Sequence, residues 1–260
     1  GDVYKRQLGV FLQGYNKERV DCEKMVMMSS NFVTASSNFE NNLIFDSYNI
    51  DRKKIKQITP GVDKETFMCD KNQKRENILL SIGRIQEQKG QINVLRFLNN
   101  FKKVDTNFLC YFIGGPSGKS GDEYLTELEG AVKELNLESN VKFLGNQTQI
   151  EIKELMNKAK LLIHTSQFET FGLVAIEANT MGIPVLTTNK GSLTEIIKSN
   201  FNGYLAEDLI DGQVNNFVKG LLNDDKYFEQ IKVNCFKKSE KFDWHNTAEE
   251  IENLYKLVLI

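Results

Sequence analysis

The stretch Phe168-Glu-Thr-Phe-Gly-Leu-Val-Ala-Ile-Glu177 combines two carboxylates, one glycine and the start of an apolar helix. Glu169 falls on the loop ahead of Gly172, and Glu177 falls within the helix that we predict to follow. The start of a helix leaves its first N–H groups without intrahelical partners and carries partial positive charge. Glycine keeps a side chain out of the approach to these groups. The stretch therefore predicts an anion site, such as a phosphate site, at the amides of Gly172 and the two residues after it.

Glu177 has an unusual setting for a glutamate on a helix, where a solvated face is the ordinary interpretation. At about 100° per residue, the neighbours on its own face are mostly apolar. These neighbours are Leu173, Val174, Thr180 and Met181. A carboxylate among them should have a polar partner. Because an ionised glutamate only accepts hydrogen bonds, the hydroxyls of a bound sugar are suitable donors.

Around this stretch, continuous apolar runs alternate with amphipathic segments. This alternation predicts an α/β fold in which a doubly wound, Rossmann-like parallel sheet is covered by helices on both faces. Ligands of such sheets lie beyond the carboxyl ends of the strands. The predicted strands are residues 78–83, 108–114, 141–144, 161–165, 184–188 and 203–205.

Two further segments flank the predicted sheet. Residues 8–62 predict the tail of a second α/β domain, with strands at 31–37 and 54–59 around a helix at 39–48. Residues 1–7 resemble translated adapter sequence, so we treat them as a non-native leader. The expected domains are therefore the leader 1–7, the remnant 8–62, the Rossmann-like domain 63–242 and a C-terminal helical segment 243–260. The lone Trp244, at the bend before the last helix, is expected to act as a buried packing anchor.

The composition excludes several classes of protein. A net charge of −2 and a pI near 5.9 provide no general basic surface for nucleic acid. The four cysteines are far apart in the sequence, which argues against a zinc site and a disulfide framework. No apolar run is long enough to span a membrane, and no signal peptide is recognisable. We expect a cytoplasmic protein and leave open a peripheral contact with the inner face of the membrane.

The first loop after a strand, Gly83-Arg-Ile-Gln-Glu-Gln-Lys-Gly90, carries two cations five residues apart. A solvated polar loop is the plain alternative. However, Arg84 as a planar fork and Lys89 as a mobile point charge could close on one diphosphate, because they lie between the end of a strand and the start of a helix.

A second loop, Gly114-Gly-Pro-Ser-Gly-Lys-Ser120, looks like a nucleotide-binding P-loop. That motif needs four residues between its first glycine and Gly-Lys-Ser, and counting back from Gly118 places Ile113 at the glycine position. The spacing therefore argues against a P-loop nucleotidase.

Together, these residues resemble the nucleotide-sugar site of the retaining family 4 glycosyltransferases, which have the GT-B fold. The resemblance is carried by Glu169 and Glu177 at E-x7-E spacing, by Phe171-Gly172 between them, and by Gly182-Ile-Pro-Val185 after them. The loop Gly-Arg-x-x-x-x-Lys-Gly matches the diphosphate loop of that family. The resemblance implies that 63–242 binds the nucleotide sugar, that 8–62 is what is left of the acceptor-side domain, and that the last helix packs back on that domain.

The resemblance also implies roles for individual residues. Glu169, Arg84 and Lys89 would be the catalytic groups. Glu177 would bind the ribose hydroxyls, and the loop at Asn146 would hold the nucleobase. The expected substrate-binding residues are Gly83, Phe171, Gly172, Leu173, Glu177, Gly114 and Asn146.

Three other polar residues lie near these motifs. His164, at the end of an apolar strand, is interpreted as a core histidine in preference to a catalytic one. Lys190 stands where the resembled family often has a small residue, so no role is assigned to it. Glu195 is expected to cap its own helix or to face solvent.

The resemblance thus implies transfer of a glycosyl group from a nucleoside-diphosphate sugar to an acceptor hydroxyl with retention of anomeric configuration, this chain being the donor-binding part. The expected partners are this donor and an acceptor that is a glycan, a lipid or a small molecule. No cofactor, metal or nucleic acid is expected. Two alternatives stay open, a nucleotide-sugar-binding module without transferase activity and a sugar-nucleotide 2-epimerase of the same fold.

Overall fold

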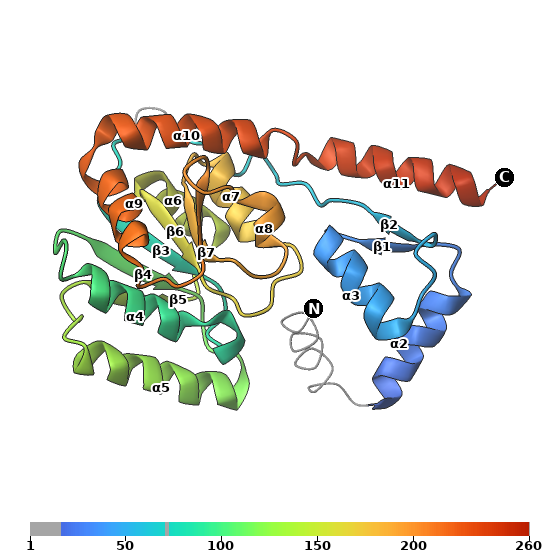
Figure 1. Ribbon diagram of the computed structural model, residues 1–260, viewed down its shortest axis with the longest axis horizontal. Helices are drawn as coiled ribbons and strands as arrows, with labels where there is room; N and C mark the ends of the chain where they lie inside the picture. The colour runs from blue at the N-terminus through green and yellow to red at the C-terminus, as the bar shows by residue number, and fades with distance from the viewer. Residues whose placement is uncertain (1–16, 71–72, 260) are drawn as a thin grey trace.

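The computed structural model describes residues 17–70 and 73–259 and contains one large parallel sheet (Figure 1). The strand order is β5-β4-β3-β6-β7-β8, and every neighbouring pair is parallel. This arrangement confirms the predicted doubly wound α/β fold. The strands are β3 (Ile78–Ile82), β4 (Leu109–Ile113), β5 (Val141–Gly145), β6 (Leu161–His164), β7 (Val185–Thr188) and β8 (Gly203–Ala206).

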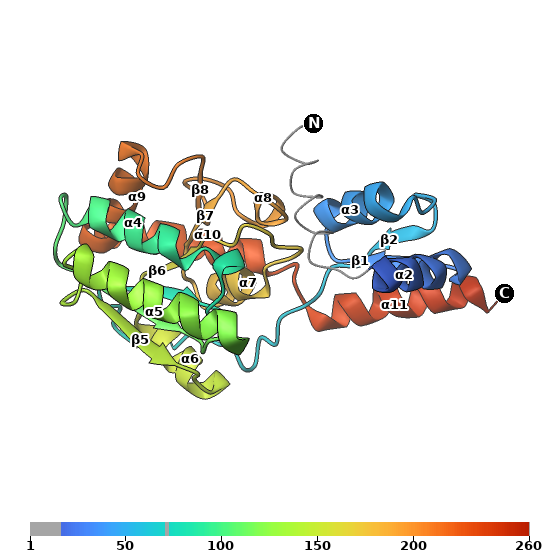
Figure 2. The same ribbon diagram turned by 90° about the horizontal axis from the view of Figure 1, so that it is seen from below.

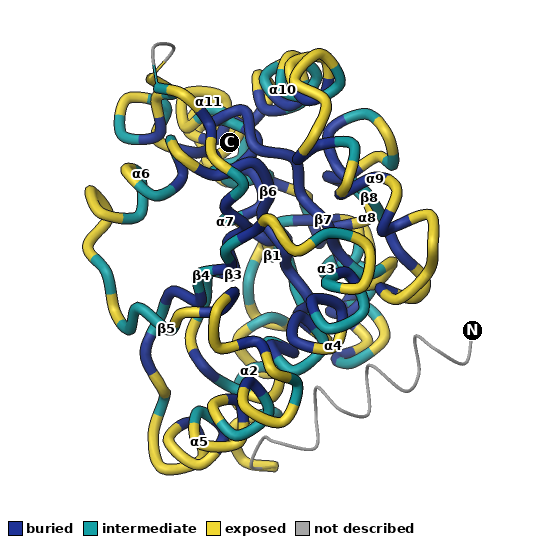
Figure 3. The backbone as a smooth tube through the Cα atoms, turned by 90° about the vertical axis from the view of Figure 1, so that its left-hand side faces the viewer, coloured by how far each residue is buried: buried dark blue, intermediate teal, exposed yellow. Residues whose placement is uncertain are grey.

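Helices cover both faces of this sheet. On one face the core is formed with α4, α5, α9 and α10, and on the other with α6, α7 and α8. In Figure 3 the strands β6 and β7 lie in the buried interior, whereas α5 is largely exposed. The helices are α4 (Gln91–Phe101), α5 (Gly118–Glu134), α6 (Gln149–Lys158), α7 (Leu173–Thr180), α8 (Leu193–Ile196), α9 (Gly212–Asn223) and α10 (Asp225–Ser239).

Successive residues of the strands enter opposite cores. In β3, Leu79 packs with the α4 side, while Ile78 and Leu80 pack with the α7 side. In β6, Leu161 packs with the α4 side and Leu162 packs with the α7 side. This period of two, with apolar residues on both sides, explains why the strands read as continuous apolar runs.

The N-terminal part forms a small β-α-β unit. Strands β1 (Val33–Ala35) and β2 (Ile55–Gln57) pair in parallel, and α3 (Asn38–Tyr48) connects them. Both strands are shorter than predicted. The helix α2 (Lys17–Ser29) precedes this unit and has no buried residue. The predicted leader, residues 1–7, lies outside the described residues.

The chain passes between the two parts twice, along neighbouring paths. Val62 forms a parallel bridge with Asp243, and Lys64 Nζ lies 2.8 Å from a carboxylate oxygen of Asp243. The helix α11 (Trp244–Val258) then extends alongside the N-terminal part (Figures 1 and 2), where Thr247 Oγ1 donates to the Thr59 carbonyl at 2.8 Å. Within the described residues, no helix is both long and apolar enough to cross a membrane.

The expectation for Trp244 was wrong. This residue is the first of α11 and is 51% exposed. Phe242 is the buried aromatic at the bend, where its ring meets that of Phe171 edge-on at 6.0 Å. Phe242 lies before the start of α11 and Trp244 begins the helix, so the two side chains point in different directions. Only the side chain of Phe242 is directed into the core.

Arg75 connects the segment before β3 to the amino edge of the sheet. Its guanidinium donates to the backbone carbonyls of Met156, Ala159 and Met181, and burial lowers the pKa of this group. Three carbonyls that end or follow helices therefore depend on one buried cation. Such groups are costly to bury without a donor.

We expect Arg75→Ala to lower the free energy of unfolding by about 3 kcal/mol, because buried carbonyls would lose their donor. Urea denaturation followed by circular dichroism measures this change. Arg96→Ala, which removes an exposed arginine of the same domain, is the matched control and should change stability by less than about 0.5 kcal/mol. Equal effects of the two substitutions would contradict the assigned role of Arg75.

Candidate functional site

The carboxyl ends of β3 and β6 meet at the point where the order of the strands reverses. The chain proceeds from β3 outward to β4 and β5, and then returns to the other side of β3 as β6. In open α/β sheets, ligands bind in the crevice at this reversal. The loop that leaves β3 carries the two predicted cations, and the loop that leaves β6, together with the helix α7 after it, carries the two predicted carboxylates.

Hydrogen bonds to backbone carbonyls hold these two loops together. Thr165 Oγ1 donates to the Gly90 carbonyl at 2.8 Å, and the amide of Gln167 donates to the Gln88 carbonyl at 2.9 Å. Gly90 has a positive φ of 69°, and a Cβ there would lie 2.4 Å from the carbonyl oxygen of Thr165. Only glycine therefore permits this approach.

A cavity of about 520 Å³ lies over these loops. It contains eight of the ten residues predicted for the site, together with residues of the N-terminal part. This volume lies in the range of small-molecule sites. The cavity is lined by Ser36, Pro60, Ile82, Gly83, Arg84, Lys89, His164, Glu169, Thr170, Phe171, Gly172, Leu173, Val174 and Glu177.

Glu169 is held by two partners in this cavity. Lys89 Nζ lies 2.9 Å from Glu169 Oε2, and His164 Nε2 lies 3.0 Å from the same oxygen. Burial by itself would raise the pKa of Glu169, but the hydrogen bonds and charges of His164 and Lys89 outweigh it and lower the pKa to about 2. Glu169 is therefore ionised at neutral pH. Its second oxygen, Oε1, forms no hydrogen bond among the described residues.

Glu177 differs from Glu169 in having no such partner. Its carboxylate makes no hydrogen bond with the described residues, and burial raises its pKa to about 7. A half-buried carboxylate without a donor costs free energy. A ligand that brings hydroxyl donors would remove this cost.

The backbone between the two glutamates has the geometry expected for an anion site. Gly172 is the N-cap of α7 with a φ of 85°, and Leu173 is the first helical residue and 43% exposed. The positive φ favours glycine at this position, and a Cβ there would lie 2.5 Å from Cδ2 of Leu193, so that side chain would have to move. The ring of Phe171 is buried, which leaves its backbone at the cavity.

Arg84 also lines the cavity, from the loop after β3. It is exposed, and its guanidinium has no hydrogen-bond partner among the described residues. An arginine held at the rim without a protein partner is available for an anionic ligand.

Gly114 and Asn146 do not line this cavity. Gly114 packs on the backbone just after β3, since a Cβ there would lie 2.2 Å from the carbonyl oxygen of Gly83. Asn146 Oδ1 accepts from the amide of Gly115 at 2.7 Å, so it ties the neighbouring loops together. The side chain of Lys119, the lysine of the P-loop-like segment, is 92% exposed on α5. This position is consistent with the rejection of a P-loop.

His164 is the polar residue of the cavity whose contact the sequence did not predict. It is buried, as expected for a core histidine, but its ring also faces Glu169. Its position at the carboxyl end of a strand was the only available signal. Ser36 and Pro60 could not be predicted, because they come from the N-terminal part.

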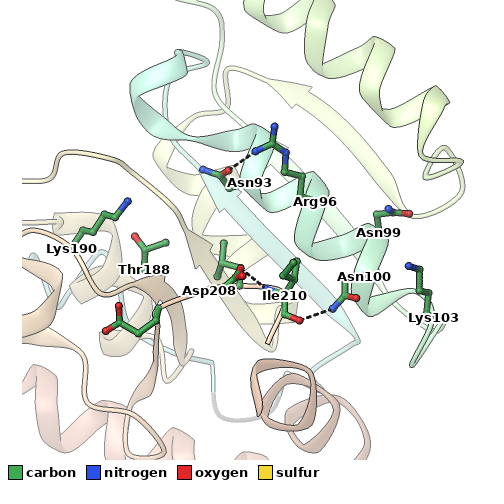
Figure 4. A pocket seen from close by; sticks show the side chains of 11 residues that line it. Asn93, Arg96, Asn99, Asn100, Lys103, Thr188, Lys190, Asp208 and Ile210 are labelled. Carbon is green, nitrogen blue, oxygen red and sulfur yellow. Dashed lines mark hydrogen bonds between the residues drawn. The ribbon is translucent and has the colours of Figure 1, made fainter. Parts of the chain in front are cut away.

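A second pocket of about 530 Å³ runs along α4 and includes Lys190. Its side chains do not converge on one point (Figure 4): Arg96 turns toward Asn93, and Asn100 donates to the backbone carbonyl of Ile210 at 3.2 Å. The first cavity is therefore the candidate functional site.

The sheet domain is similar to proteins of a known family. Residues 63–238 match the model of the family described as glycosyl transferases group 1. The match covers more than half of the chain, and the protein belongs to this family of glycosyltransferases, as the sequence resemblance implied.

Two relatives carry the name D-inositol 3-phosphate glycosyltransferase. The one from a Nocardioides species is 25% identical over 257 residues, which cover 92% of this chain and 56% of the relative. The one from Corynebacterium urealyticum is 26% identical over 249 residues, which cover 90% and 58%. The chain thus spans a little over half the length of these relatives.

Solved structures show the same GT-B fold. Anabaena HepE, in complex with UDP and glucose, has a TM-score of 0.81 at 20% identity, covering 94% of this chain and 68% of HepE. Sucrose-phosphate synthase from Thermosynechococcus elongatus has a TM-score of 0.83 at 23% identity, covering 99% and 65%. At these identities the similarity establishes the fold.

The raised pKa of Glu177 predicts a specific dependence of stability on pH. Between about pH 4.5 and pH 7, the carboxyl group of Glu177 has lost its proton in the unfolded chain and keeps it in the folded chain. A rise in pH through this range therefore lowers the free energy of unfolding. Glu177→Gln removes the ionisation. We expect this variant to gain stability over the parent near pH 8 and to gain less near pH 5.

Urea denaturation of both proteins at the two pH values measures the difference. Glu138→Gln, at an exposed position, is the control and should show no such pH-dependent gain. A Glu177→Gln variant whose gain is the same at both pH values would contradict the burial of an unpartnered carboxylate.

Proposed function

We propose that this chain binds a nucleoside-diphosphate sugar and contributes the donor side of a glycosyl transfer to an acceptor hydroxyl. The observation that carries the proposal is the convergence of two cations, two carboxylates and a helix N-terminus on one cavity. These groups match the two ends of such a donor, a diphosphate and a set of hydroxyls. Membership in the glycosyltransferase family and the UDP and glucose bound in Anabaena HepE support this interpretation.

Arg84, Lys89 and the amides at the start of α7 would hold the diphosphate. Lys89 has three donors, so it can keep its contact with Glu169 while it binds a phosphate oxygen. Positive charge fixed at this place stabilises the negative charge that grows on the departing nucleoside diphosphate. The proposed chemistry therefore needs no metal ion.

The two glutamates would bind different parts of the donor. Glu169, ionised and held by His164 and Lys89, offers its free oxygen to a hydroxyl of the transferred sugar. Glu177 would accept from the ribose hydroxyls. Binding would then lower the pKa of Glu177, because the new hydrogen bonds favour its ionised form.

Transfer with retention would proceed on one face of the sugar. The bond between the anomeric carbon and the diphosphate oxygen breaks, a bond from the acceptor oxygen to that carbon forms, and the acceptor proton passes to the departing phosphate. This proposal requires no protein base between donor and acceptor. The acceptor is a hydroxyl compound, either a glycan, a lipid or a small molecule.

Donor binding tests the assignment of the cavity. We expect Lys89→Ala and Glu177→Ala each to raise the dissociation constant for UDP-glucose by about 10-fold or more, since a hydrogen bond to a charged group contributes about 1.5–3 kcal/mol. Isothermal titration calorimetry measures this constant. Lys190→Ala and Glu207→Ala, which alter the second pocket, are the matched controls. Unchanged affinity in both site variants would reject the assignment.

Product stereochemistry tests the transfer itself. A longer form of the protein that covers the full length of its relatives should convert an α-linked nucleotide sugar into an α-linked product, as proton NMR of the anomeric signal would show. A β-linked product would exclude retention. A 2-epimerised sugar nucleotide would instead support the epimerase, and donor binding without any product would support a binding module.

A further inference from the structure

The first turn of α3 is bound by a carboxylate of the sheet domain. Glu195 Oε1 accepts from the amide of Phe39 at 2.8 Å, and Oε2 accepts from the amide and the side-chain amide of Asn38 at 3.1 and 3.0 Å. The next amide, that of Glu40, donates to Ser37 Oγ. Glu195 therefore caps a helix of the other part of the chain, and the expectation that it caps its own helix or faces solvent was wrong.

The same turn of α3 contacts the loop that carries Glu169. Ser37 Oγ donates to the carbonyl oxygen of Thr170 at 2.6 Å. The ring of Phe39 meets that of Phe168 edge-on, with centroids 5.7 Å apart. The residues on either side of Glu169 are thus in contact with the N-terminal part.

The opposite side of this loop rests on the start of α8. The amide and hydroxyl of Ser192 donate to the carbonyl of Glu169 at 3.1 and 3.0 Å. Leu193 packs so closely that a Cβ at Gly172 would lie 2.5 Å from it. The loop 168–172 lies between α3 and α8, and Glu195 connects these two helices directly.

We propose that Glu195 is a positioning residue that docks α3 against α8 and thereby holds the loop 168–172 in its donor-binding conformation. A carboxylate at a helix N-terminus gains both charged hydrogen bonds and a favourable interaction with the helix dipole. Without it, two amides of α3 lose their acceptor, and the contacts of Ser37 and Phe39 with the loop lose their support. The effect on donor binding rests on the function proposed above, whereas the docking of α3 does not.

The test measures docking and donor binding separately. Spin labels at Lys53→Cys and Lys133→Cys, both exposed positions, report the distance between the two parts by pulsed electron paramagnetic resonance. Cys22→Ser and Cys69→Ser remove the thiols that are not buried, while Cys110 and Cys235 stay in the core. Calorimetry of the unlabelled chain with UDP as the probe gives the dissociation constant.

We expect Glu195→Ala to broaden the distance distribution and to weaken UDP binding by about 10-fold, as estimated for the loss of charged hydrogen bonds. Glu195→Gln retains one acceptor oxygen and should give an intermediate result in both measurements. Glu138→Ala, at an exposed turn of the sheet domain, should change neither. A graded response shared by both measurements would distinguish positioning from general destabilisation.

Two outcomes would overturn the proposal. An unchanged distance distribution in Glu195→Ala would show that Glu195 does not dock α3, and a broadened distribution with unchanged UDP affinity would show that docking does not position the loop. If the parent chain binds no UDP, the donor assignment fails. Docking would still be supported by a narrow parent distribution that Glu195→Ala broadens.

Discussion

The site depends on the close approach of two loops at the reversal of strand order. Gly90 and Thr165 bring the backbones of these loops together, and this approach places Lys89 of one loop 2.9 Å from Glu169 of the other. A parallel sheet with this strand order leaves a crevice between β3 and β6, because the helices that follow these two strands pack on opposite faces of the sheet. The cations after β3 and the carboxylates after β6 therefore meet even though 80 residues separate Lys89 from Glu169.

The two glutamates illustrate how environment determines the behaviour of one residue type. Both are partly buried, yet the pKa of Glu169 is lowered to about 2 while that of Glu177 is raised to about 7. The difference comes from His164 and Lys89, which stabilise the charge of Glu169, whereas Glu177 has only the cost of burial. One carboxylate is fixed in place by the protein, and the other is left for a ligand to satisfy.

The cavity belongs to both parts of the chain. Ser36 and Pro60 contribute to its wall, and the first turn of α3 contacts the loop on which Glu169 lies. Glu195 of the sheet domain accepts a hydrogen bond from the backbone of that first helical turn. The conformation of the donor loop and the docking of the N-terminal part are therefore linked through a small set of hydrogen bonds.

The sequence by itself determined the sheet and the two loops, because periodicity and short-range spacing dictate local backbone structure. The resemblance to a known family grouped ten residues, and eight of them line one cavity. It did not determine which groups meet across the chain. The packing role of Gly114, the exposure of Trp244, the contact of His164 with Glu169 and the bond from Glu195 to α3 all appear only in the tertiary structure. Glu195 and Asn38 are 157 residues apart. No local pattern encodes such a contact, since the packing of two separate cores decides which side chains face one another.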